Sequence, residues 1–367
     1  MPNNCVRRCS VRGLSIGLAA LLSFASSTQA LTVQFRDVSS NGGMTAAQLG
    51  AFQTAAGYWA SVITDPVTVY IDIAFNNLPA HVLGSTDAAV LTASYADVRS
   101  RLLADSTSLL DSSAVAHLQA STALGFQATQ GDLSSRFDAD GSANNSLLTM
   151  TTANAKALGL ATSTSPGNAD AVIEFATYFH QQNAFSYSRI GGVPAGQYDF
   201  ISIAEHEIGH ALGFVSGVDD IDYCAGAANR CAADGVGSGA DRFEGDAWYA
   251  PLDLFRYSAN GVLDLRVGGT PYLSVDGGQT SIDRLSTGEY NGNGYQASHF
   301  GPSSMALMQP DLATGPGGDA TNADLAALDA IGWNLASAVP EPGSWALLLA
   351  GLLTVGAAAR RRSAAPA

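Results

Sequence analysis

Residues 197–214 of the chain form the stretch QYDFISIAEHEIGHALGF. Its apolar residues recur at helical spacing and no proline interrupts them, so it predicts a helix that ends near Gly213. His206 and His210 are four residues apart and therefore lie on one face of that helix, where both imidazoles can reach one Zn²⁺. Glu207 lies about 100° around the helix from His206, where it can accept a proton from a zinc-bound water without becoming a ligand. The pattern predicts a catalytic zinc site on an apolar helix.

A catalytic zinc needs a third protein ligand and keeps its fourth position for water. In the compact pattern HExxHxxGxxH the third ligand follows the second histidine by six residues, but Ser216 stands there and is a poor zinc ligand. His299 has the best context, because it follows a Gly- and Asn-rich loop and precedes Met308 in GYQASHFGPSSMALMQPDL, residues 294–312. A glutamate ligand would come from a following helix, for which 242–248 is a weak candidate. The remaining candidates for the third ligand are His180, Glu244, Asp219, Asp220 and Asp222.

Four segments together resemble the leishmanolysin-like branch of the zincin metallopeptidases. They are HEIGHALGF at 206–214, Ser298-His299-Phe300, Leu307-Met308-Gln309-Pro310 and LAALDAIGW at 325–333. More narrowly, they are similar to secreted bacterial metallopeptidases that carry a PEP-CTERM tail. The resemblance implies that His206, His210 and His299 bind zinc, that Glu207 is the base, and that Met308 forms a Met-turn beneath the metal, with Met305 as the alternative. It also implies a zincin fold, in which a small twisted sheet backs the active-site helix and an irregular C-terminal subdomain forms the floor of the cleft.

Residues 31–338 are predicted to form one catalytic domain of the α+β class, with a cleft between about 31–216 and 217–338. Strands are predicted at 31–35, 67–75 and 171–179, and His180 lies at the end of the last one. Helices are predicted at 45–63, 95–110 and 323–331, with Thr45 as N-cap of the first and Thr321 or Asn322 as cap of the last. After residue 216 the chain is rich in Gly, Asn and Asp, and its apolar runs are short.

Both ends of the chain are predicted to be targeting signals rather than parts of the domain. Residues 1–30 combine three arginines, an apolar stretch and the small-residue site Thr28-Gln29-Ala30, which is typical of a secretory signal peptide. Residues 339–362 begin Val-Pro-Glu-Pro, continue with an apolar run at 345–359 and close on three arginines, and they resemble the PEP-CTERM sorting signal of Gram-negative bacteria. That resemblance implies transient membrane anchoring by a short transmembrane segment and recognition by an exosortase-type enzyme. Residues 363–367 are a tail, and the mature protein is predicted to be secreted or held at the cell surface or extracellular matrix.

Two smaller motifs carry weaker predictions. Cys224 and Cys231 remain once the leader is removed, and in an oxidising compartment they predict a local disulfide rather than a metal site. The run Asp138-x-Asp140-Gly141-Ser142-x-Asn144 has the look of a calcium loop, but it lacks the later glutamate of an EF-hand. It is therefore predicted to be an ordinary surface turn.

The charge of the chain argues against one class of function, the binding of nucleic acid. The 17 basic and 32 acidic side chains give a formal charge of −15, which argues against binding to nucleic acid. Removing the six terminal arginines and Glu341 leaves 11 basic and 31 acidic side chains, a net charge of −20. We therefore expect an exported zinc endopeptidase that cuts protein or peptide substrates with a zinc-bound water activated by Glu207. Two different functions are also compatible with the sequence: a non-catalytic surface or matrix binding protein on a zincin scaffold, and a zinc hydrolase of non-peptide amides or esters.

Overall fold

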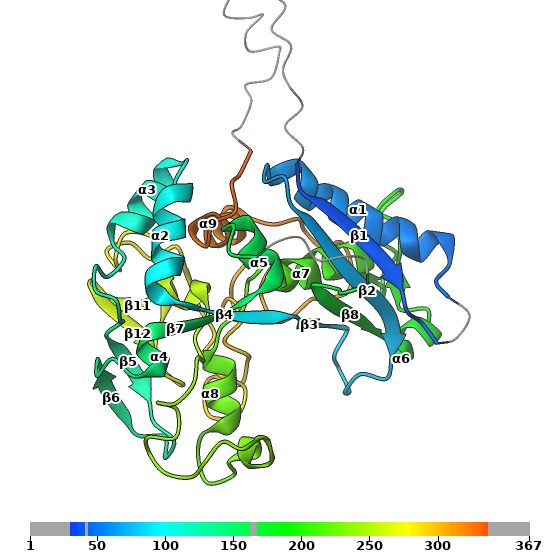
Figure 1. Cartoon of the computed structure of the whole chain (residues 1–367). Helices are drawn as coiled ribbons and strands as arrows, with labels where there is room; N and C mark the ends of the chain where they lie inside the picture. Colours follow the sequence, from blue (N-terminus) through cyan, green and yellow to red (C-terminus); the bar gives the residue numbers. More distant parts are fainter. Residues whose placement is uncertain (1–29, 41–42, 162–166, 337–367) are drawn as a thin grey trace, which may run out of the picture.

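The computed structural model describes residues 30–40, 43–161 and 167–336. The predicted signal peptide, apart from Ala30, and the predicted sorting segment and tail lie outside the described residues. Among the helices of the described ranges, none is long and apolar enough to cross a membrane; the apolar run at 345–359 is outside them. The described residues form a mixed α and β structure with two lobes (Figure 1).

The first lobe is built on a four-stranded sheet in the order β1 (Thr32–Asp37), β2 (Thr68–Asn76), β8 (Ala171–Ala176) and β3 (Gly84–Ala88). The first three strands are parallel, and β3 runs antiparallel to β8 at the edge. Helices α1 (Ala46–Val62) and α7 (Phe200–Ala211) pack on this sheet (Figure 1). Phe52, Phe175 and Phe200 join α1, β8 and α7, with ring centroids 4.3–5.3 Å apart in the buried core. The aromatic cluster therefore fixes α7 against the sheet.

The second lobe is built on a six-stranded sheet in the order β14 (Asp283–Arg284), β13 (Tyr272–Leu273), β11 (Arg256–Ala259), β12 (Val262–Leu265), β5 (Phe126–Thr129) and β6 (Ser135–Asp138). Strand β12 pairs in parallel with β5, so segments from both sides of residue 216 share this sheet. The boundary predicted at 216/217 therefore does not divide the chain into two lobes. The antiparallel pair β4 (Val90–Ser94) and β7 (Leu147–Thr151) lies between the two sheets (Figure 1).

The other elements are short and cover the sheets or connect their strands. They are α2 (Tyr95–Asp105), α3 (Leu109–Ala116), α4 (Ala143–Ser146), α5 (Thr152–Ala157), α6 (Thr177–Gln181), α8 (Val218–Cys224), α9 (Asn322–Ala330), β9 (Phe185–Ser186), β10 (Tyr198–Asp199), and the 3₁₀ helices η1 (Arg230–Asp234) and η2 (Pro251–Phe255). The predicted disulfide between Cys224 and Cys231 is confirmed and joins the end of α8 to η1.

The predicted helix caps are confirmed. Thr45 caps α1 and Thr321 caps α9, each in a reciprocal capping box with the third helical residue. The prediction of one helix over 95–110 is wrong in extent, because α2 ends at Asp105 and a second helix, α3, begins at Leu109. Ser108 then starts α3 by accepting a hydrogen bond from the Asp111 N–H, while the Asp111 carboxylate accepts from the Ser108 N–H.

Two predictions near the site are also wrong. The strand predicted at 171–179 ends at Ala176, because its last ladder pair joins Ala176 to Asn76. Without a neighbouring strand the chain turns into α6, so His180 lies on a short helix instead of a strand. The weak helix at 242–248 is absent, since those described residues form turns and an irregular loop.

Candidate metal centre

Helix α7, which carries the HExxH motif, is held along its whole length. Asp199 caps it by accepting hydrogen bonds from two backbone N–H groups of the first turn. The Trp59 indole N–H donates to the carbonyl oxygen of Glu205 at 3.0 Å, and the Trp333 indole N–H donates to that of Leu212 at 2.7 Å. Ten of its 12 residues are buried, so α7 is a fixed base for the side chains it presents.

Three histidines meet at the end of this helix. His206 and His210 come from α7, and His299 comes from the loop between β14 and α9. Their Nε2 atoms form a triangle with sides of 3.1 Å (His206–His210), 3.2 Å (His206–His299) and 3.3 Å (His210–His299). The opposite nitrogen of each ring, Nδ1, faces a backbone carbonyl: that of Leu307 at 2.8 Å for His206 and that of Phe214 at 2.7 Å for His210. For His299 the carbonyl is that of Gln296, at 3.3 Å.

These partners decide where the ring protons are. A carbonyl can only accept, so each Nδ1 carries the proton and each Nε2 keeps a free lone pair. Burial, together with the nearby His206, lowers the pKa of His210 to about 3, and burial beside His210 and His206 lowers the pKa of His299 well below its usual value. Three neutral imidazoles with converging lone pairs fit a cation. A tetrahedral zinc with Zn–N bonds of about 2.0–2.1 Å separates its ligand nitrogens by roughly 3.3 Å, close to the sides of this triangle.

Glu207 is buried beside the three histidines and is held by the edge strand β3. The Thr86 hydroxyl lies 2.7 Å from Glu207 Oε2 and 2.9 Å from the Glu207 carbonyl oxygen. Burial raises the pKa of Glu207, while His206 and the hydrogen bond from Thr86 lower it. Gly84 makes room for the carboxylate, because a Cβ there would lie 2.8 Å from Glu207 Oε1. Neither Thr86 nor Gly84 carries a sequence signal for this role, since only the fold brings β3 beside α7.

Of the three aspartates considered as zinc ligands, Asp219 and Asp222 hold a backbone loop, and Asp220 lines the cleft. Asp219, at the start of α8, accepts hydrogen bonds from the Ala297 N–H at 2.5 Å, the Ser298 N–H at 2.9 Å and the Ser298 hydroxyl at 2.5 Å. It therefore anchors the two residues that precede His299. Asp222 anchors the same loop further back, by accepting from two backbone N–H groups at residues 290 and 291. Asp220 lines the cleft, and burial, with the nearby Asp253, raises its pKa.

The other two candidates for the third ligand, and the Ser216 that stands at the third position of the compact pattern, are engaged elsewhere in the fold. His180 Nδ1 lies 2.9 Å from the Tyr187 hydroxyl. The Ser216 hydroxyl donates a hydrogen bond to Asp253 Oδ1 at 2.6 Å. Glu244 lies in the second lobe, where it pairs with Arg136 and accepts a hydrogen bond from the Ser142 hydroxyl at 2.7 Å. Among the described candidates, His299 is the one that the fold brings to His206 and His210.

The turn below the histidines contains Met308, which is buried, whereas Met305 is 88% exposed. Met308 packs against Gly209 of α7 so closely that a Cβ on Gly209 would lie 2.6 Å from the Met308 sulfur. Asp324 of α9 holds the turn by accepting from the Leu307 and Met308 N–H groups, both at 2.9 Å. Since the Leu307 carbonyl accepts from His206, this clamp also orients the first histidine. The packing supports Met308 over Met305 as the turn residue.

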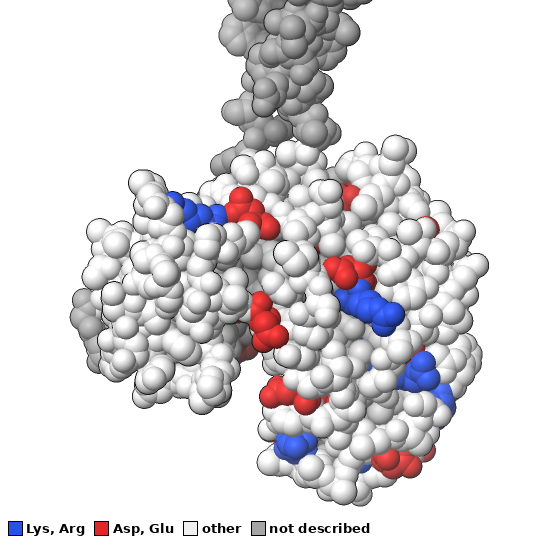
Figure 2. Space-filling model, turned by 180° about the vertical axis from the view of Figure 1, so that it is seen from behind, with Lys and Arg blue, Asp and Glu red and all other residues white. Residues whose placement is uncertain are grey.

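A cleft of about 980 Å³ opens above the histidines. Its lining comes from both lobes, including β3, α7, the start of α8 and the loops at 289–299 and 305–312. Its described lining includes no Lys or Arg but six acids: Glu207, Asp219, Asp220, Glu289, Asp311 and Asp319. Acidic side chains are visible along the hollow between the two lobes in Figure 2. The cleft is therefore suited to uncharged or cationic ligands.

Comparison with known families matches residues 338–362 to the PEP-CTERM protein-sorting motif. No curated protein and no solved structure matches the chain. The motif shows that the protein is exported and sorted at its C-terminus to the cell surface or extracellular space of a Gram-negative bacterium, with an exosortase recognising the motif. The matched segment lies C-terminal to the domain that contains the three histidines.

Proposed function

We propose that this exported protein is a zinc-dependent endopeptidase of the zincin type. The observation that carries the proposal is the triangle of unprotonated Nε2 atoms of His206, His210 and His299, with the buried carboxylate of Glu207 beside it. The four-stranded sheet behind α7 and the buried Met308 turn agree with the same type of enzyme.

The chain's own residues provide the following chemistry. His206, His210 and His299 would hold the metal as neutral ligands, oriented by the three backbone carbonyls behind them. When bound, zinc would lower the pKa of a coordinated water to about 7 and polarise the scissile carbonyl. Glu207 accepts the proton of the attacking water and, because it lies in a buried site, can pass it to the leaving amine. Thr86 holds the Glu207 carboxylate at the cleft and keeps its rotamer fixed.

Metal analysis tests the ligand set. The purified protein is expected to hold about one zinc per chain, and His299→Ala is expected to lose most of it. His180→Ala is the matched control, because the sequence also allows His180 as a ligand and the structure places it against Tyr187. Full zinc content in His299→Ala would remove His299 from the site.

Digestion of casein and a mixed peptide library tests the reaction. Wild-type protein should cut, and Glu207→Ala should retain zinc while losing activity by a factor of about 10² to 10⁴. Glu174→Gln, on β8 and outside the cleft lining, should be as active as wild type. Zinc-loaded wild type that cuts no peptide would favour the binding protein or the hydrolase of non-peptide amides and esters, and an ester and amide panel separates those two.

A further inference from the structure

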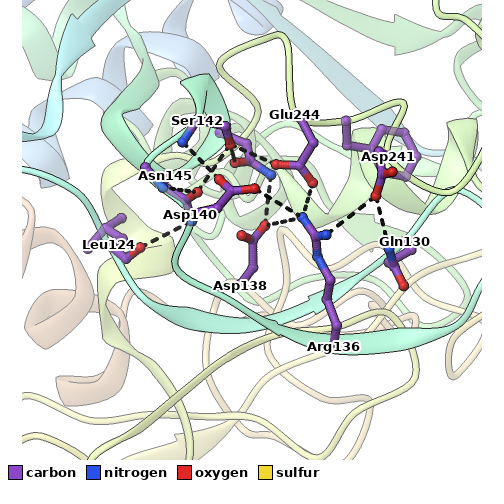
Figure 3. Close-up of polar contacts among 12 residues, drawn as sticks. Leu124, Gln130, Arg136, Asp138, Asp140, Ser142, Asn145, Asp241 and Glu244 are labelled. Carbon is purple, nitrogen blue, oxygen red and sulfur yellow. Dashed lines mark hydrogen bonds and ion pairs between the residues drawn. The ribbon is translucent and has the colours of Figure 1, made fainter.

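A second group of potential metal ligands lies in the second lobe. Asp138 ends β6, Asp140 lies in the turn that follows, and Glu244 comes from the loop between η1 and η2. Each offers a carboxylate oxygen, and these oxygens lie within 4.8 Å of one another. The sequence predicts only a surface turn at 138–144, because no glutamate follows at EF-hand spacing. The fold supplies that carboxylate from a distant part of the chain, as Figure 3 shows.

The group contains two polar atoms that lack partners. The side chain of Asp138 is 1% exposed, and its Oδ1 is buried without a hydrogen-bond partner. Its other oxygen, Oδ2, accepts from Asn144 Nδ2 at 3.1 Å and pairs with Arg136. The Nε of Arg136 is also buried without a partner. A buried carboxylate oxygen left unpaired is costly, so the group as it stands is incomplete.

Arg136 is the cation that now occupies the group. Its Nη2 contacts Glu244 and lies 3.3 Å from Asp138 and 3.7 Å from Asp140, while Nη1 lies 3.4 Å from Asp241 (Figure 3). One positive charge therefore faces four carboxylates. The Arg136 side chain is 29% exposed, so it can turn towards solvent when another cation enters.

The donor set is made of oxygen atoms, which calcium prefers over zinc. Asp138, Asp140 and Ser142 alternate along the turn, and Gly141 takes a φ of +81° that lets the turn close. The Ser142 hydroxyl already lies 2.7 Å from Glu244 Oε2, so the turn and the distant loop meet at the group. We propose that Asp138, Asp140 and Glu244 form a calcium-binding site, with Arg136 as the counter-ion of the calcium-free protein.

Such a site would stabilise one wall of the cleft. The loop that carries Glu244 continues to Trp248 and Ala250, which line the cleft. Backbone hydrogen bonds already join this loop to α4 and β7. The Ala143 N–H donates to the Glu244 carbonyl at 3.0 Å, and the Thr149 N–H donates to the Tyr249 carbonyl at 2.9 Å. Calcium would reinforce this junction, and the inference does not depend on the proposed peptidase activity.

Calorimetric titration of the purified, exported protein with CaCl₂ tests the site. We expect one calcium per chain with a Kd of about 1 mM or tighter, and a calcium-dependent rise in Tm of roughly 2–5 °C. Asp140→Asn and Glu244→Gln should each weaken binding by about tenfold or more. Arg136→Gln should tighten it by about threefold or more, because the competing cation is gone. Asp234→Asn, which changes an exposed acid at the end of η1 and outside this group, is the matched control and should leave the Kd within about twofold.

The side chain of Asp140 is 53% exposed, so Asp140→Asn is expected to fold, and its Tm without calcium verifies this. Absence of calcium uptake up to about 10 mM in both wild type and Arg136→Gln would overturn the proposal. Uptake that is unchanged in Asp140→Asn and Glu244→Gln would also overturn it, because the calcium would then bind elsewhere.

Discussion

Replacing Asp219 tests whether this residue anchors the loop of the proposed metal centre or binds the metal itself. In the structure its carboxylate accepts three hydrogen bonds from residues 297 and 298, next to His299. Asp219→Ala leaves two backbone N–H groups and one hydroxyl without an acceptor, and each buried unpaired donor costs about 1–3 kcal/mol. The loop can relax, so only part of this cost appears in metal binding. Losing a group that orients a metal ligand weakens metal affinity by about 10- to 100-fold, or roughly 1.4–2.7 kcal/mol.

The assay is competition for zinc between the protein and a chromophoric chelator. Asp219→Ala should bind zinc about 10- to 100-fold more weakly than wild type but still reach one zinc per chain at saturation. Asp219→Asn should fall between the two, because its amide oxygen can accept while its NH₂ group cannot. Asp220→Asn changes a neighbouring acid that lines the cleft, and its zinc affinity should stay within about twofold of wild type.

Two outcomes would contradict an anchoring role for Asp219. Wild-type affinity in Asp219→Ala would show that the His299 loop keeps its place without the carboxylate. A loss as large as that of His299→Ala, with less than one zinc at saturation, would show that Asp219 binds the metal directly. The sequence alone allows that second role.

Three further predictions concern stability and substrate choice. In urea titrations, Gly209→Ala should lower the free energy of unfolding by about 1–3 kcal/mol, because its Cβ would lie 2.6 Å from the Met308 sulfur. The control is Gly57→Ala on the open side of α1, which should raise the free energy of unfolding by about 0.5–1 kcal/mol. Burial raises the pKa of Asp329 to about 6, so ionising it costs stability as pH rises from about 4 to 6 and that cost persists above pH 6. Asp329→Asn, which keeps an acceptor for the Ser108 hydroxyl, should therefore raise Tm by roughly 2–4 °C at pH 7.5 and little at pH 4.5, and an equal gain at both would contradict this. Finally, the acidic cleft should favour peptides with Lys or Arg near the scissile bond by about tenfold in kcat/KM over acidic analogues at low ionic strength, and a preference that survives roughly 1 M salt would not be electrostatic.

Local patterns in the sequence predicted the elements that depend on neighbouring residues. The periodicity of 197–214 predicted α7, and Thr45 and Thr321 predicted the starts of α1 and α9, because helix periodicity and N-caps act within a few residues. The errors arose where partners from elsewhere decide the outcome. The strand at 171–179 stops where β2 stops, and nothing in its own residues reports that limit. The residues around Thr86 likewise do not predict its hydrogen bond to Glu207, because that contact depends on β3 lying at the sheet edge beside α7.

The many aspartates show why their charge alone could not decide which residues bind a metal. Asp219 and Asp222 hold the His299 loop, Asp253 holds the segment after α7, and Asp324 holds the Met308 turn, each by accepting hydrogen bonds from backbone N–H groups. The second half of the chain has few regular strands to satisfy these groups, so buried carboxylates take the place of ladder partners. A sequence shows where such carboxylates occur but not which backbone groups they face. The excess of acids in the mature chain therefore reflects, in part, how an irregular loop region is held rigid enough to present a third histidine to α7.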